Sequence, residues 1–222
     1  MNQAILDLLT SWRTNNGFAA DDSSALSTTQ TEKLVTELQA EIAKISVRPF
    51  DPTGTFSWRA DANPLGYGGR FSADVQGFEA AKAISHSSGG GIFYITDPPA
   101  GKLLNDSALR GLVADVIGGS NAASLADQIF DGKFVDNVRA SSKAIGNLLA
   151  ISDFVSQRMM IETAHGDVRI LAPFAENGRV LGDTELPSLL VKEAVTKLNG
   201  IPKAVFQAVY DIAFAKGGVE AA

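Results

Sequence analysis

The spacing of apolar residues changes at Pro49 and Pro52, and this change limits the possible folds more than any other feature of the sequence. Before Pro49, apolar side chains recur three and four positions apart, as on one face of a helix: Leu34, Val35, Leu38, Ile42 and Ile45. After Pro52, TFSWRAD alternates large and small or polar residues, and GIFYITD is a compact run of β-forming residues bounded by glycines and prolines. We therefore expect strands at 55–60 and 92–96, one small mixed sheet and an α+β fold.

Residues 1–48 are predicted to form a helical N-terminal extension. A short first helix is expected at about 2–13, and a capping box formed by Thr29 and Glu32 predicts the start of a second. The small and polar residues at 17–30 are typical of a linker between the two helices. We expect limited proteolysis to cut this linker first.

The remainder, 49–222, is predicted to be one α+β domain that carries a large helical insertion at about 105–164. Within the insertion, the apolar spacing of KFVDNVRASSKAIGNLLAISDFVSQRMMIETA predicts a long helix. Asn177-Gly178 indicates a hairpin between two short β-type runs. The spacing across 185–198 predicts a further helix, and 201–214 can also be helical.

Composition excludes several classes of site. The chain has no cysteine and only two histidines, His86 and His165, so a disulfide, a thiolate nucleophile, a Cys-ligated zinc and a multi-histidine metal site are all excluded. A net charge of −6 without a dense Lys/Arg cluster argues against a nucleic-acid surface. No apolar run approaches the roughly 18 residues of a membrane span. Because the first residues lack a basic segment, we expect a cytoplasmic protein, or one secreted without a cleavable signal peptide.

Several short motifs follow one another along the chain. Trp58-Arg59-Ala60-Asp61 is followed by Pro64, Gly68-Gly69, Phe71-Ser72-Ala73 and the strand-like IFYITDPP; later come Asp183-Thr184-Glu185, Gly200-Ile201-Pro202 and AVYDIAF. This order resembles the mono-ADP-ribosyltransferase toxins, in particular the cholera and heat-labile enterotoxin group. The resemblance covers roughly 55–104 and 180–214. It implies a sheet core of the ADP-ribosyltransferase type, with AVYDIAF as an aromatic-rich final strand.

The resemblance also implies residues that bind NAD, the substrate of such enzymes. Arg59 would offer a planar, permanently charged group to the pyrophosphate. An aromatic side chain would stack on nicotinamide, and the possible residues are Phe71, Tyr94 and Tyr67. In a second group of NAD-consuming toxins that the chain also resembles, Arg70 would act together with Arg59.

Catalysis in this family requires carboxylates, because the ribose becomes an oxocarbenium-like cation as nicotinamide leaves. By the resemblance, Glu185 would stabilise this cation, and Ser72 would hold the glutamate in place. Asp183 would help to activate the acceptor. Glu193 is the alternative to Glu185 if the last strand begins later in the sequence.

Two functions therefore stay open. The first is an NAD-dependent ADP-ribosyltransferase-like toxin or effector, active or degenerate, which modifies a protein target and is accompanied by a neutralising or chaperone protein. The second is a non-enzymatic structural or partner-binding protein, such as a virion component or an effector chaperone. The extent of amphipathic helix favours the second, because such apolar stripes are usually packing surfaces.

Overall fold

The computed structural model describes the following residues: 2–48, 57–58, 92–93, 98–131, 144–145, 148–170 and 184–215. The chain divides into two compact units. The first contains Met1–Val47 and Pro98–Val155, and the second contains Arg48–Asp97 and Ser156–Ala222. The domain boundary that we expect near residue 48 stays a prediction.

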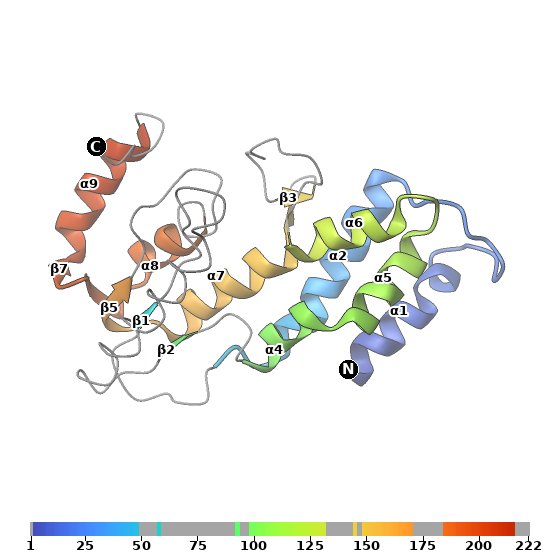
Figure 1. Ribbon diagram of the computed structural model, residues 1–222, viewed down its shortest axis with the longest axis horizontal. Helices are drawn as coiled ribbons and strands as arrows, with labels where there is room; N and C mark the ends of the chain where they lie inside the picture. The colour runs from blue at the N-terminus through green and yellow to red at the C-terminus, as the bar shows by residue number, and fades with distance from the viewer. Residues whose placement is uncertain are drawn as a thin grey trace, which may run out of the picture. The chain divides into compact units, whose positions relative to one another are not determined.

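The first unit is built mainly from helices (Figure 1). Its helical elements are α1 (Gln3–Asn15), α2 (Thr28–Ala43), α4 (Pro99–Lys102), the short 3-10 helix η1 (Leu103–Asn105), α5 (Ser107–Ile117) and α6 (Ala122–Asp131). Two short strands, β3 (Ala144–Ile145) and β4 (Leu148–Leu149), pair antiparallel. Helix α1 packs on both α2 and α5, and α5 packs on α6.

Polar side chains define where these helices begin. Asn2 caps α1 by accepting a hydrogen bond from the backbone amide of Ala4, and Asp106 caps α5 in the same way from Leu109. Helix α2 begins with a capping box of Ser27 and Gln30. The predicted box of Thr29 and Glu32 is therefore wrong by two residues, because it is Ser27 that has the extended backbone a cap requires.

The core of the first unit gathers the apolar stripes of its helices. Its fully buried large side chains include Trp12, Leu34, Leu38, Leu109 and Phe130. Trp12 also carries a polar N–H, which donates to Glu37 Oε2 at 2.7 Å. The predicted helical face of α2 is confirmed, since Leu34, Leu38 and Ile42 are all buried.

The loop between α1 and α2 is fastened to the end of α5. Arg13 donates to the carbonyls of Val116 and Ser24, at 2.7 Å and 2.9 Å, and its guanidinium lies 4.3 Å from the centre of the Phe18 ring. The Leu26 amide donates to the Ile117 carbonyl. The predicted linker is thus a connecting loop, but one held by bonds to another helix.

Close approach of this loop requires glycine at position 118. Gly118 has φ 66° and ψ 172°, a conformation that essentially only glycine adopts, and a Cβ there would lie 2.6 Å from the carbonyl oxygen of Ser24. We expect Gly118→Ala to lower the free energy of unfolding by about 1–3 kcal/mol. Urea denaturation measures this loss.

Gly111→Ala is the matched control for this prediction. Gly111 lies within α5 and has open space where a Cβ would project, so the same change should raise stability by about 0.5–1 kcal/mol. Equal effects at the two glycines would contradict the close approach of the loop.

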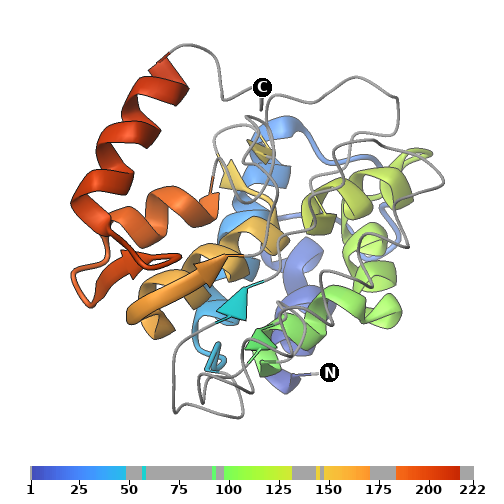
Figure 2. The same ribbon diagram turned by 60° about the vertical axis from the view of Figure 1, so that its left-hand side comes forward.

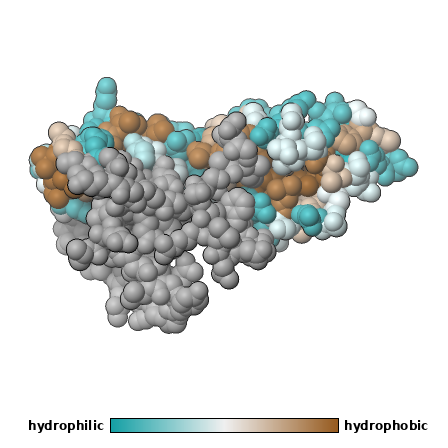
Figure 3. Space-filling view, turned by 90° about the horizontal axis from the view of Figure 1, so that it is seen from above, coloured by the Kyte–Doolittle hydropathy of each residue, from teal (hydrophilic) through white to brown (hydrophobic). Residues whose placement is uncertain are grey.

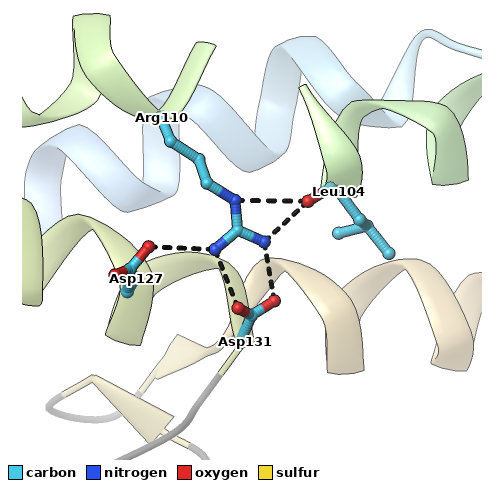
Figure 4. A network of polar contacts seen from close by, with 4 residues as sticks. All are labelled: Leu104, Arg110, Asp127 and Asp131. Carbon is cyan, nitrogen blue, oxygen red and sulfur yellow. Dashed lines mark hydrogen bonds and ion pairs between the residues drawn. The ribbon is translucent and has the colours of Figure 1, made fainter. Parts of the chain in front are cut away.

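Arg110 forms the most extensive polar network of the described residues in the first unit (Figure 4). Its Nε and Nη2 donate to the Leu104 carbonyl, at 3.2 Å and 2.6 Å. Nη1 and Nη2 donate to the two oxygens of Asp131, at 2.8 Å and 2.7 Å, and Nη1 also donates to Asp127 at 3.1 Å. Every guanidinium N–H thus has an acceptor. Hydrogen bonding to Asp131 raises the pKa of Arg110.

The second unit contains a small mixed sheet. Its strands are β1 (Ser57–Trp58), β2 (Ile92–Phe93), β5 (Gly166–Ile170), β6 (Val195–Leu198) and β7 (Ile201–Pro202). They are arranged in the order β2-β1-β5-β6-β7, and only the β6–β7 pair is antiparallel. This confirms an α+β fold, and it confirms strand structure at the described parts of 55–60 and 92–96.

The described residues of this unit include the helices α7 (Ile151–Thr163), α8 (Leu186–Val191) and α9 (Lys203–Ala215). Helix α7 starts in the first unit, and its residues from Ser156 onward belong to the second. Helix α9 packs on β6 and β7. The hairpin between β6 and β7 turns at Asn199 and Gly200, which both have positive φ as a two-residue turn of this kind requires.

Three sequence expectations need correction. Within the long helix predicted from residue 133, β3 and β4 are instead a pair of strands, and α7 begins at Ile151. In the sequence a Gly-Asn pair, which is a hairpin signal, separates the two strands. The helix predicted for 185–198 ends at Val191, since pairing with β5 makes Val195–Leu198 a strand. Residues 203–215 form helix α9 instead of the aromatic-rich strand that the resemblance implies. The predicted hairpin at Asn177-Gly178 lies outside the described residues.

Candidate functional site

Glu185 is a buried carboxylate in the second unit. Its residue is only 3% exposed, and its Oε1 accepts a hydrogen bond of 2.5 Å from the Ser156 hydroxyl. Ser156 comes from α7 and is fully buried. A buried acid is costly unless its oxygens are hydrogen-bonded, so this contact holds Glu185 in one orientation.

Glu185 lies at the start of a short helix with other buried polar residues. Glu185 directly precedes α8, and Pro187 occupies the first turn, where its missing N–H has no helical partner to lose. The Ser188 hydroxyl donates to the Thr184 carbonyl at 2.6 Å, and both residues are buried. The side chain of Glu185 does not cap this helix, and its hydrogen bond goes instead to Ser156 of α7.

The parallel strands define a second feature, the carboxyl edge of the sheet. Trp58 of β1 is the register partner of both Phe93 in β2 and Ile170 in β5, so these three residues form the last described row. Figure 2 shows β1, in cyan, between β2 and β5. β1 lies between β2 and β5, so the next strand in the sequence is added on one side of β1 and a later strand on its other side. Open parallel sheets bind ligands at such a switch point, outside the carboxyl ends of the strands.

Two of the predicted site residues lie within the described part of the chain. Glu185 is buried, whereas Glu193 is exposed in the turn that leads into the amino end of β6. The structure therefore does not show them side by side. The other predicted site residues lie outside the described residues: Arg59, Tyr67, Arg70, Phe71, Ser72, Tyr94 and Asp183.

Ser156 is the residue that sequence reasoning missed. It lies on the buried side of α7 together with Val155, Met159 and Met160. A serine on an otherwise apolar stripe was the available signal, because a buried hydroxyl needs a partner.

The described residues contain no cluster of three or more acidic, histidine or cysteine side chains that could hold a metal ion. Among the helices in the described segments, none has the length and apolar character needed to cross a membrane.

Comparisons with protein-family models, with curated proteins and with solved structures found no match to this chain.

Proposed function

We propose that this chain is an NAD-consuming enzyme of the ADP-ribosyltransferase type, which transfers ADP-ribose from NAD to a protein target. The parallel pairing of β1 with β2 carries the proposal. Trp58 and Phe93 are partners in that pair, and the residues that follow them in the sequence are Arg59 and Tyr94. In the sequence, a cation and an aromatic residue, both expected to bind NAD, thus come directly after two neighbouring parallel strands.

These two residue types match the chemistry of a dinucleotide. The Arg59 guanidinium can donate two parallel hydrogen bonds to pyrophosphate oxygens. Tyr94 can stack on a flat heterocycle and keep its hydroxyl available for a hydrogen bond. The strand order also has a switch point at β1, and parallel sheets commonly bind nucleotides outside such a point.

Glu185 supplies the carboxylate in this proposal. Because β5 and β6 are parallel, the chain between them leaves the carboxyl edge of the sheet and returns to the amino edge. This connection contains α8, and Glu185 comes directly before α8. Glu193 comes after that helix, two residues before β6, and so is nearer the amino edge. This topology favours Glu185 over Glu193 as the residue that works with Arg59.

The reaction would break the bond between nicotinamide and C1′ of the ribose, and the bonding electrons would leave with nicotinamide. A nucleophilic atom of the target protein would then bond to C1′ and lose its proton. Glu185, held by Ser156, would face the positive charge that develops on the ribose. Ser156 would thus perform the bracing role that the resemblance assigns to Ser72.

Arg59→Ala tests the cofactor-binding part of the proposal. A charge-assisted contact to phosphate is worth about 1.5–3 kcal/mol, so we expect the dissociation constant for NAD to rise about 10- to 100-fold. Isothermal titration calorimetry with NAD measures it. Lys197→Ala is the control, because it removes an exposed cation from β6 of the same sheet and should leave binding unchanged.

Wild-type protein that neither binds NAD nor releases nicotinamide would refute the proposed function. The partner-binding interpretation of the chain would then be the better account.

A further inference from the structure

Helix α9 presents an uncharged, exposed surface. Val205 and Val209 are 55% and 61% exposed, and Ala204 and Ala208 beside them are exposed as well. We call these four residues the α9 stripe. They recur four positions apart, so they share one side of the helix over two turns. Apolar residues are visible at the left-hand end of Figure 3, the end that contains α9.

A row of polar residues borders this stripe. Lys203, Gln207 and Asp211 also recur four positions apart, next to Ala204 and Ala208 on the helix surface. Opposite charges thus stand at the two ends of the row, about 12 Å apart along the helix axis. The row therefore has a positive charge at its amino-terminal end and a negative charge at its carboxyl-terminal end, whereas the α9 stripe is uncharged along its whole length.

The two charges keep the capacity to bind further groups. The Lys203 ammonium donates to the Lys192 carbonyl at 2.6 Å, which uses one of its three N–H groups. The Asp211 carboxylate accepts from the Gln207 amide through one oxygen, at 2.6 Å, and a carboxylate has about four acceptor positions.

We propose that the α9 stripe binds the same stripe of a second copy of this chain, with the two α9 helices antiparallel. A two-fold interface requires a surface that is complementary to itself, and the polar row meets this requirement. When two α9 helices pack antiparallel, the polar row of one helix lies opposite the polar row of the other. Lys203 of one copy then faces Asp211 of the other, and the two Gln207 side chains meet at the two-fold axis.

The side chains of the stripe suit such a contact. Alanines let two helix backbones approach closely, and the valines lose most of their exposed apolar area on association. A parallel arrangement would instead place the polar row opposite the other flank of the partner helix, so Lys203 and Asp211 would not meet. This inference is independent of the proposed NAD chemistry.

Sedimentation velocity over a range of protein concentrations tests the interface. We expect wild-type protein to form a dimer and Val209→Glu to raise the dimer dissociation constant at least about tenfold, because it places a charge in the apolar contact. Ile161→Glu is the matched control. Ile161 is an exposed apolar residue of the second unit too, at 42%, but it lies on α7, so the dimer should persist.

Charge reversal tests the antiparallel arrangement. Lys203→Glu and Asp211→Lys should each weaken the dimer, and the double variant should restore it. Wild-type protein that stays monomeric at all concentrations, a dimer that survives Val209→Glu, or equal loss in Ile161→Glu would overturn the interface. A double variant that is no better than either single one would overturn the arrangement. Circular dichroism confirms that each variant is folded.

Discussion

Glu185→Gln should reduce the rate of nicotinamide release from NAD by at least about a hundredfold, the usual cost of losing one electrostatic group that stabilises a transition state. The glutamine keeps the volume of the side chain, and its amide oxygen can still accept the hydrogen bond from Ser156. Only the negative charge is lost, so the dissociation constant for NAD should change by less than about threefold. Chromatography of released nicotinamide and calorimetry of NAD binding measure the two effects.

Glu193→Gln provides the control for this prediction. It makes the same chemical change at an exposed position in the turn before β6, and we expect turnover to stay at the wild-type level. Ser156→Ala should lower turnover less than Glu185→Gln does, because it leaves the carboxylate charged and removes only its restraint. Full activity in Glu185→Gln, or an equal loss in Glu193→Gln, would exclude Glu185 as the catalytic carboxylate.

Arg110→Ala should lower the free energy of unfolding by about 3 kcal/mol. The substitution removes all five donors at once and leaves the Leu104 carbonyl and the Asp131 carboxylate without their partner. It also removes the packing of the guanidinium on the Phe130 ring, 4.9 Å from its centre. Because the Arg110 side chain is only 20% exposed, water cannot fully replace these contacts. Urea denaturation followed by circular dichroism measures the change.

Two variants separate this network from a simple ion pair. Asp127 is 59% exposed, so Asp127→Asn should cost less than about 1 kcal/mol. Arg110→Lys keeps the charge but cannot reproduce the planar set of five donors, so it should recover only part of the stability. If Arg110→Lys matches the wild type, charge alone accounts for the effect and the geometry of the network does not.

Local pattern was sufficient for much of the fold. Leu34, Leu38 and Ile42 repeat over several turns, and a repeat of that length specifies a helix and its buried face. Ile92 and Phe93 belong to a short run of β-forming residues with glycines before it and prolines after it, and these abrupt boundaries identified the strand. Tertiary pairing decided the rest. Val195 and Leu198 fit a helical spacing equally well, and only the presence of β5 beside them makes the segment a strand.

The candidate site could be predicted only in part. The resemblance indicated Glu185, but sequence spacing could not show that Ser156, 29 positions away, donates to it. A contact between residues so far apart depends on how α7 and α8 pack, and local propensity contains no information about that packing. The order of the strands was equally inaccessible, although the proposed NAD site depends on the parallel pairing of β1 with β2.

The chain has two tryptophans, and the division into units gives one to each: Trp12 is buried in the first, and Trp58 belongs to β1 in the second. Each unit therefore contains its own intrinsic fluorophore. In Trp58→Phe, tryptophan emission excited at wavelengths that tyrosine does not absorb reports on the first unit alone, and in Trp12→Phe it reports on the second. Coincident urea transitions in these two proteins would mean that the units unfold in one cooperative step, and separate transitions would yield the stability of each unit without any attached label.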